Sequence, residues 1–375
     1  MVVEANVPQA LIRDLGLNSC TKDFIDELLE KPIMRNPLSE AEKATTPNEI
    51  PLSTGGCVSL VAYWVFSETI FDADQPVPHM HIFPDHFLLL HKLLAESPED
   101  QIGMSPAVAE GLVAIGLWLQ ASGHISEHPE SASQLPPDAT AESDENVPSG
   151  YMRYLHLITL VALYHPRLHV RNAASTLAGQ IFVADPSDED RLRILQDLLE
   201  NCTFGSLKAL AVTWLRDAIR DTPRPDRSIN GPAPSVFATQ EALETLIPVV
   251  FPRLWKLEKL ELLEVADFFG QNMSFLLQAA NLGLFLFWTE TRWSHVLPRR
   301  SDETVRTRWF NPLSAAVERL NEAAAGAGEL ILGGLDAKHE ARLGRLRTDL
   351  GVLAERLANL KATTGFNVAE KEDRA

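Results

Sequence analysis

Cysteine is scarce in this chain of 375 residues, which contains only Cys20, Cys57 and Cys202. Three cysteines without a CxxC pair cannot build the disulfide framework of a small secreted domain. The first residues also lack the basic region and the apolar run of a signal peptide. We therefore expect a soluble intracellular protein in a reducing compartment, the cytoplasm.

Positive charge is in deficit as well. The sequence has 33 lysines and arginines against 51 aspartates and glutamates, which gives a formal net charge of −18. Surfaces that follow nucleic-acid phosphates or bind anionic membranes need the opposite balance, so the composition disfavours both partners. The most apolar stretch, 275–288, contains two amide side chains and is too short to span a bilayer.

Motifs that carry chemistry are missing. The sequence has no P-loop, no GxGxxG loop, no nucleophile elbow and no paired-cysteine zinc motif. Carboxylates spaced three residues apart, such as those at 258–264, are typical of a solvated helix face. We therefore expect no enzymatic activity, no cofactor and no metal.

One group of histidines has the composition of a metal site without its spacing. The group consists of His79, His81, His86 and His91, with Asp85 among them. It matches no HExxH pattern, and a helix that begins at Pro84 would hold His86 and His91 on different faces. A further pair, His165 and His169 on either side of Pro166, is better explained by capping and packing than by catalysis.

Helical spacing of apolar residues dominates the pattern, and alternating strand patterns are rare. We predict an N-terminal helix and loop over 1–50 and a helical lobe over 51–124. The individual helices expected here are 22–31, 57–71, 84–96 and 106–121, with a loop over 31–56 that ends in Gly55-Gly56.

Two segments and a tail lack the residues of a packed core. Residues 125–149 carry six acidic side chains, four prolines and no lysine or arginine. Such a segment cannot bury enough apolar surface to offset its ordering entropy, so we predict a disordered acidic linker. A Pro-rich loop is expected at 223–238 and a disordered tail at 364–375.

Between these segments, residues 150–222 contain two similar helix–turn–helix units. The first pairs helices 151–165 and 168–182, and the second pairs helices 187–201 and 206–219. Aligning the second helices gives four equivalent pairs, each 37 residues apart: Val170 with Leu207, Arg171 with Lys208, Ala174 with Ala211 and Leu177 with Trp214. This period is close to that of HEAT and armadillo repeats.

The repeat predicts an all-α fold with HEAT/armadillo-like helical repeats, an α-solenoid, with an unrelated helical bundle as the alternative. Small residues would let the inner helix approach its partner, and Arg171 could reach neighbouring carboxylates or carbonyls. Ser187 is expected to cap the third helix of the repeat region, since acidic residues follow it. The whole chain is expected to form two helical lobes separated by the acidic segment.

Residues 239–297 are predicted to form buried helices. One helical stripe consists of Leu246, Val250, Leu254, Leu257 and Leu260. The aromatic-rich run 285–288 and Trp293 fit either core packing, which we favour, or a groove for a partner.

The C-terminal region 298–363 is predicted to be a basic loop followed by a helical pair. Leucines recur there at alternating spacings of three and four residues, at Leu343, Leu346, Leu350, Leu353, Leu357 and Leu360. We favour antiparallel docking of this helix against the preceding helix around 312–324. The alternative is a homodimeric coiled coil.

Two candidate functional features remain. Positive charge concentrates around the predicted basic loop, at Arg292, Arg299, Arg300, Arg306 and Arg308. These side chains form either a solvated loop or a docking patch for an acidic segment, from a partner or from the 125–149 linker. Cys202 is a candidate redox residue, although its place near a helix C-terminus disfavours a thiolate and favours a structural role. Cys20 and Cys57 are expected to be structural.

Residues 150–219 resemble the fungal YAP-binding/glomulin family, which includes a plant protein of lateral-root formation. The likeness is carried by Met152-Arg153-Tyr154, by HPRLHVRNAA at 165–174, by DPSDEDRLRILQDLLENC at 185–202 and by LKALAVTWLRDAI at 207–219. Segments 51–66 and 81–94 fit less closely. Family members carry a longer N-terminal helical array than residues 1–50 provide, so we expect a truncated or divergent N-terminus.

The resemblance implies an all-helical adaptor without enzymatic activity. Fungal relatives bind the bZIP transcription factor of the oxidative-stress response and support its peroxide-driven activation, and a related fungal protein works at the kinetochore. Animal and plant relatives mask the RING subunit of cullin–RING ubiquitin ligases. The implied partner is therefore a bZIP factor or a RING subunit, with the nucleus as a second location besides the cytoplasm.

Overall fold

The computed structural model describes residues 55–56, 58–59, 61–62, 65–66, 80–94, 97–126, 149–222, 235–287, 297–326 and 337–363. Several sequence-based predictions lie outside these residues: the N-terminal region 1–50 with Cys20, then Cys57, the acidic residues 127–148, residues 223–234, residues 288–296 with Arg292 and Trp293, and the tail 364–375. The chain forms two compact bodies, 1–186 and 187–375.

Almost every described residue lies in a helix, and none of them lies in an extended strand; one parallel bridge joins Phe83 to Ser126. The all-α class predicted from the sequence is confirmed. The stacking of the two 37-residue units as a solenoid stays a prediction, since the units belong to different bodies. Among the described helices, none alone is long and apolar enough to cross a membrane, and α6 with α7 meet that criterion only as a pair bent by 99°.

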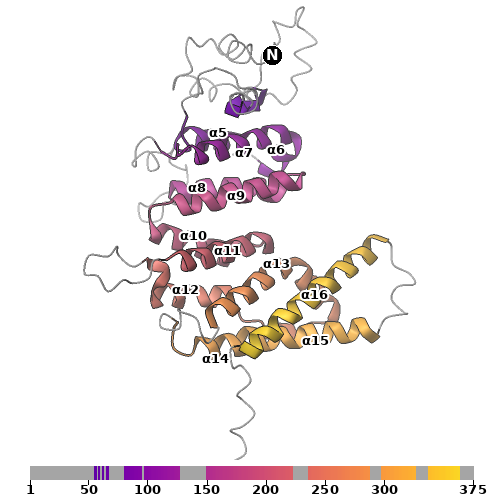
Figure 1. Ribbon diagram of the computed structural model, residues 1–375. Helices are drawn as coiled ribbons and strands as arrows, with labels where there is room; N and C mark the ends of the chain where they lie inside the picture. The colour runs from indigo at the N-terminus through magenta and orange to yellow at the C-terminus, as the bar shows by residue number, and fades with distance from the viewer. Residues whose placement is uncertain are drawn as a thin grey trace, which may run out of the picture. The chain divides into compact units, whose positions relative to one another are not determined.

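Among the described residues, the first body contains helical residues at 55–56, 58–59, 61–62 and 65–66 and five further helices (Figure 1). These are α5 (Asp85–Leu94), α6 (Pro98–Met104), α7 (Pro106–Ala121), α8 (Gly150–Tyr164) and α9 (Leu168–Ala184). Helices α8 and α9 form an antiparallel hairpin that packs against α5, α6 and α7. Because these contacts bridge the acidic segment, the boundary between the bodies falls after Pro186 and not at 125–149, where the sequence places it.

Three sequence-based assignments in this body are wrong. Gly55 and Gly56 are helical, although the sequence predicts a loop that ends there. Helix α6 was not predicted, although Ser97-Pro98 followed by two acidic residues is a regular helix start. The predicted disordered linker begins with ordered residues, because Ile82 and Phe83 donate backbone hydrogen bonds to the carbonyls of His124 and Ile125, each at 2.9 Å.

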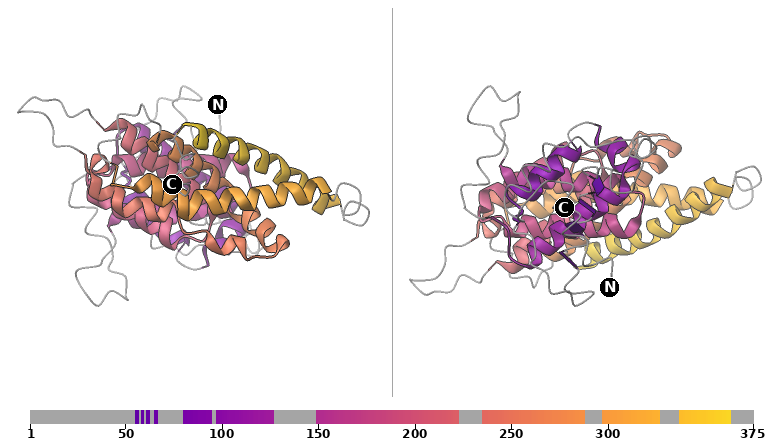
Figure 2. Two further views of the ribbon diagram at one scale, coloured as in Figure 1. Left: turned by 90° about the horizontal axis from the view of Figure 1, so that it is seen from below. Right: turned by 90° about the horizontal axis from the view of Figure 1, so that it is seen from above.

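The second body contains seven α-helices among the described residues (Figure 2). They are α10 (Asp188–Asn201), α11 (Gly205–Asp221), α12 (Gln240–Val250), α13 (Leu262–Phe287), α14 (Ser301–Val305), α15 (Asn311–Gly326) and α16 (Ala337–Thr363). Short turns are η4 (Val236–Ala238), η5 (Trp255–Glu258) and the π-helical turn η6 (Arg306–Phe310). Helix α13 is central, since it contacts α11, α15 and α16.

The two repeat units have the same local burial pattern, each within its own body. Val170, Ala174 and Leu177 are buried on α9, and their equivalents Leu207, Ala211 and Trp214 are buried on α11. The polar residues at equivalent positions, Arg171 and Lys208, do not have the contacts that the sequence predicts for Arg171. No described residue pairs with the Arg171 guanidinium, whose Nε atom is buried without a hydrogen bond, whereas the Lys208 ammonium lies over the Phe275 ring, 5.8 Å from its centroid.

Asp188 fastens the start of α10 to the segment that precedes α12. Its carboxylate accepts hydrogen bonds from the Ser235 hydroxyl at 2.7 Å, from the Val236 backbone N–H at 3.1 Å and from Arg191. Burial opposes ionisation, but these hydrogen bonds outweigh it and hold the pKa of Asp188 below its usual range. The end of the predicted Pro-rich loop therefore forms the turn η4, which Asp188 holds by hydrogen bonds. Ser187 caps α10 as predicted, accepting the Asp190 N–H at 3.1 Å.

The predicted stripe through 246–260 does not lie on one helix. Helix α12 ends at Val250, and Pro252 follows before the short turn η5. Leu254 and Leu257 are nevertheless buried, because the turn folds back onto the core. At the end of α13, Leu286 and Phe287 are buried, and the Phe287 ring lies 6.1 Å from that of Phe251, so these two residues pack in the core.

The C-terminal leucines pack inside this chain. Leu350, Leu353, Leu357 and Leu360 are buried, and α16 packs against α13 and, antiparallel, against α15 (Figure 2). Docking on the preceding helix, the favoured alternative, is present, and α13 supplies a second surface that the sequence did not indicate. A side chain at Gly283 of α13 would meet Leu360 at 3.4 Å.

Helices α11 and α13 cross closely at Gly205. A Cβ atom at this position would lie 2.4 Å from the backbone oxygen of Gln271 and 3.1 Å from Cα of Asn272. Backbone atoms cannot move aside as a side-chain tip can, so only glycine allows this crossing.

We expect Gly205→Ala to destabilise the protein by about 2 kcal/mol, through overpacking against the α13 backbone. Gly351→Ala on α16 is the matched control, since nothing lies within 4 Å of its added Cβ. It should stabilise the protein by roughly 0.5 kcal/mol, the helix preference for alanine. Urea unfolding of both variants measures the difference, and equal effects would contradict the close crossing.

Candidate protein-interaction site

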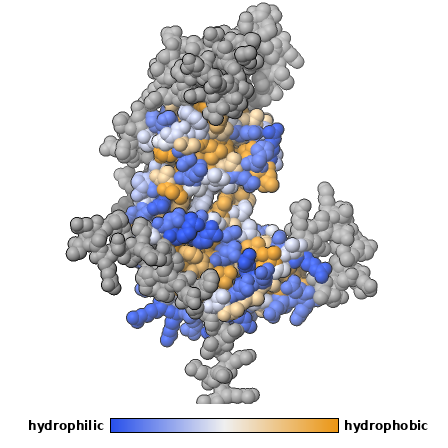
Figure 3. All heavy atoms as spheres, viewed as in Figure 1, coloured by the Kyte–Doolittle hydropathy of each residue, from blue (hydrophilic) through white to orange (hydrophobic). Residues whose placement is uncertain are grey.

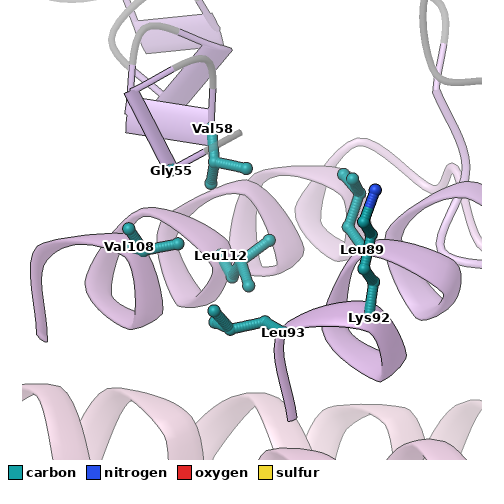
Figure 4. A pocket seen from close by; sticks show the side chains of 7 residues that line it. All are labelled: Gly55, Val58, Leu89, Lys92, Leu93, Val108 and Leu112. Carbon is teal, nitrogen blue, oxygen red and sulfur yellow. The ribbon is translucent and has the colours of Figure 1, made fainter. Parts of the chain in front are cut away.

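A small cleft in the first body offers space but little chemistry. It is a shallow depression between α5, α7 and the helical residues near 55, with about 270 Å³ of space that includes open solvent (Figure 4). Its lining is Gly55, Val58, Leu89, Lys92, Leu93, Val108 and Leu112. Lys92 is the one ionisable side chain in this lining, so the cleft has no acid–base pair or nucleophile with which to catalyse a reaction.

His86 is the centre of a buried polar group in the first body. Its Nε2 lies 2.7 Å from the carbonyl oxygen of Leu112, and its Nδ1 lies 3.0 Å from the hydroxyl of Tyr154. The carbonyl can only accept, so Nε2 carries the proton and Nδ1 accepts the tyrosine O–H. Burial lowers the pKa of His86 to about 4 and raises the pKa of Tyr154 well above its usual value. Both groups are neutral and structural.

The other histidines of the sequence group have separate surroundings. The His81 ring stacks edge-on against His124 at 5.7 Å, and its backbone N–H donates to Asp85. The His91 ring lies 6.0 Å from Phe87. Within the described ranges, no group of three or more His, Cys, Asp or Glu side chains could hold a metal ion. His79 lies outside these ranges.

His165 ties the α8–α9 turn to the start of α7. Its Nδ1 accepts the Arg167 backbone N–H at 3.2 Å, so Nε2 donates to the carbonyl of Pro106 at 3.0 Å. Arg167 also pairs with Glu110 at 3.0 Å, and the exposed His169 lies 3.8 Å from the same carboxylate. His165 therefore has the capping and packing role that the sequence predicts.

Cys202 lies at the C-terminal end of α10, as expected, and is half-buried. Its Sγ accepts the backbone N–H of Phe204 at 3.4 Å. A redox role for Cys202 stays a prediction.

The basic segment, predicted from the sequence to be a loop, is helical from Ser301 onward, whereas Arg299 and Arg300 lie in the turn before it and Arg292 lies outside the described residues. From Ser301 onward α14, the π-helical turn η6 and α15 follow one another without a break. Arg299, Arg300 and Arg308 are exposed and Arg306 is half-buried. Hydrophilic side chains gather over α14 on the face in Figure 3. Turns of π-helix are rare and often mark functional sites.

A further arginine, Arg253, joins this segment through the backbone. The N–H of Leu254 donates to the carbonyl oxygen of Arg308 at 2.9 Å, which brings the exposed Arg253 beside η6. Sequence reasoning missed Arg253 because it lies some fifty residues before the other arginines. The only sequence feature that pointed to Arg253 is its place next to Pro252, just after the end of a helix.

The segment that carries Arg253 is held on both sides. The Phe251 ring packs edge-on against Trp309, with centroids 5.2 Å apart. The guanidinium of Arg319, on α15, donates to the backbone carbonyls of Leu257 and Leu260 at 3.0 Å and of Glu258 at 3.4 Å. We call Arg253, Arg299, Arg300, Arg306 and Arg308 the cationic surface.

Within the described ranges, the guanidiniums of the cationic surface have no partner. Among the described residues, none of its five guanidiniums forms a hydrogen bond or ion pair, whereas Arg167, Arg191 and Arg220 in the same chain all do. Residues 297–310 contain four arginines and the two acidic residues of α14, Asp302 and Glu303, which gives this segment a net charge of +2 in an acidic chain. Unpaired guanidiniums can bind carboxylates in a bidentate manner, so the geometry fits recognition and not catalysis.

Comparison with protein families gives one match over most of the chain. The profile of a kinetochore-related family, described as an uncharacterised protein family, YAP/Alf4/glomulin, matches residues 10–355. The resemblance stated from the sequence is thereby confirmed, and the match extends well beyond 150–219. No curated protein shows significant sequence similarity to the chain.

Acid should destabilise the first body through His86. Its pKa of about 4 in the folded state lies below the value of about 6.5 in an unfolded chain, so between these values the unfolded chain binds more protons. The contribution of neutral His86 to the free energy of unfolding is complete above pH 6.5 and is lost as the pH falls. The loss is about 2 kcal/mol between pH 7 and pH 5.

The measurement is urea unfolding at both pH values, for the natural protein and for His86→Gln. We expect the variant to lose less stability on acidification. Gly351→Ala, which alters no titratable group, should leave the pH dependence unchanged. An identical pH dependence in the natural protein and His86→Gln would contradict the neutral buried state.

Proposed function

We propose that this chain, which belongs to the YAP/Alf4/glomulin family, is an adaptor without enzymatic activity that acts by binding a protein partner. The observation that carries the proposal is the family match over 10–355. The unpaired arginines of the second body and the absence of acid–base chemistry in the described cleft support a binding role.

The partner we propose is the bZIP transcription factor of the oxidative-stress response. In this proposal the helical surface binds the factor stoichiometrically and holds it while a peroxidase oxidises its cysteines. HEAT-like stacking of the two repeat units would supply an extended rigid surface for this task. The complex would form in the cytoplasm, with the nucleus as a second location.

Two alternatives follow from the same family. One is regulation of a cullin–RING ubiquitin ligase through its RING subunit. The other is a scaffold at the kinetochore, which the kinetochore-related family description favours. All three roles need a protein-binding surface and none needs a catalytic group, so the identity of the partner distinguishes them.

The main proposal predicts that the tagged full-length chain recovers the bZIP factor from fungal cells, and that cells lacking the chain lose peroxide-driven activation of that factor. Cys202→Ser should retain both properties if Cys202 is structural, because the oxidised cysteines belong to the partner. Affinity purification with and without peroxide, followed by mass spectrometry, measures recovery.

Reproducible absence of both association and stress sensitivity would overturn the bZIP role. Recovery of a RING subunit in its place, together with slower ubiquitin transfer by the purified ligase, would support the first alternative. Recovery of kinetochore proteins would support the second.

A further inference from the structure

A partly exposed aromatic turn lies next to the cationic surface. Trp255 is 50% exposed, and the apolar side chains of Leu262 and Leu263 that follow it are 40% and 75% exposed. We call residues 255–263 the aromatic turn. Tryptophan and arginine are the residues most enriched among the contacts that dominate protein–protein binding, and here they occur side by side.

The aromatic turn is preorganised. Lys256 and Lys259 place their ammonium groups 5.9 and 5.3 Å from the Trp255 ring centroid, and Arg319 holds the turn carbonyls from the other side. Leu257 anchors the turn in the core. A surface fixed before binding loses less conformational entropy when a ligand docks.

Charge differs between the two parts of this region. Arg253 leads directly into the turn, and Arg308 is fixed beside it by the Leu254 N–H. Exposed carboxylates lie on the other side of Trp255, at Glu258, Glu261 and Glu264. Lys256 and Lys259 lie in the same stretch, so residues 255–264 carry two positive and three negative charges. An acidic ligand is therefore attracted most strongly at the arginine end, and apolar contact is available at Trp255 and the leucines.

We propose that the cationic surface and the aromatic turn form one docking surface for a bipartite peptide segment of a protein partner, with acidic residues that contact Arg253 and Arg308 and an apolar residue that packs on Trp255. This inference rests on the proposed adaptor function, to which it adds the location of the site and the chemistry of the partner segment. Charge complementarity argues for this occupant: guanidiniums that have no partner among the described residues attract carboxylates, and the half-exposed Trp255 ring offers area for an apolar side chain.

A protein segment fits this surface better than a nucleic acid does. The chain carries a net charge of −18, which repels a long polyanion that must run across much of its surface. A short acidic segment is exposed mainly to charges within a Debye length of about 8 Å, where the arginines dominate.

The test uses a fluorescein-labelled peptide of four alternating Asp and Glu residues followed by Gly-Phe-Leu, titrated with the full-length protein in a fluorescence anisotropy assay. We expect saturable binding that weakens with added salt. Arg253→Glu combined with Arg308→Glu should weaken binding about tenfold or more, since two attractions become repulsions. Trp255→Ala should weaken binding of this peptide. It should not change the affinity for a second peptide in which Gly-Ser-Ser replaces Gly-Phe-Leu.

Arg193→Glu combined with Arg347→Glu is the matched control, because both arginines are exposed in the second body and the charge change is identical. Circular dichroism melting checks that every variant is folded. If the double arginine variant unfolds, Trp255→Ala still tests the proposal, because it removes only an exposed side chain. Equal weakening by both double variants would overturn the proposal, as would a peptide that does not bind. Competition by duplex DNA as effective as by unlabelled peptide would show a general polyanion site and overturn it too.

The two proposals fail separately. If Arg253→Glu with Arg308→Glu abolishes peptide binding but leaves recovery of the bZIP factor intact, this surface is not the adaptor site, while the adaptor function stands. If the peptide binds as expected and no bZIP factor is recovered, the proposed partner is wrong and the docking chemistry stands.

Discussion

The guanidinium of Arg319 fixes the position of the candidate interaction surface. By donating to carbonyls at 257, 258 and 260 it satisfies backbone acceptors that no helix or sheet pairs. The chain can therefore leave α12 at Val250, pass over η6 and enter α13 with only the short 3-10 turn η5 between them. Without this arginine the turn would lose the bonds that hold Trp255 and Arg253 in place.

The first body depends on a different constraint, the close approach of α5, α7, α8 and α9 around His86. A Cβ atom on Gly116 of α7 would lie 2.6 Å from Leu177, 3.0 Å from the His86 ring and 3.2 Å from the Tyr154 hydroxyl. Glycine there lets three helices converge on one imidazole, whose two nitrogens are both satisfied. Polar groups placed so deeply stabilise a fold only when they are fully paired.

Long helices with regular apolar spacing could be predicted from the sequence. Helix α7 and the four helices of the repeat units have ends within two residues of the predicted ones, since Pro106, Ser149 and Ser187 mark their starts. The leucines of α16 were recognised for the same reason. Contacts between distant segments could not be predicted: Arg253 beside Arg308, and Arg319 on the η5 carbonyls, depend on tertiary packing that leaves no local pattern. Helix α6 was missed because seven residues carry too little periodicity.

The π-helical turn η6 makes the interaction surface tolerant of a change in chain length. A π turn holds one more residue than a regular helical turn, and here the extra residue lies between the arginine-rich start of α14 and the core residue Leu313. Deletion of one residue from 306–310 would let α14 and α15 merge into a regular α-helix. Because the wide turn takes up that residue locally, Arg299 and Arg300 would keep their face relative to Leu313 after the deletion, and Val305 would stay buried. A related protein with one residue fewer at this point would therefore present the same arginines on the same face, so a difference of one residue in chain length leaves both the recognition surface and the hydrophobic core in place.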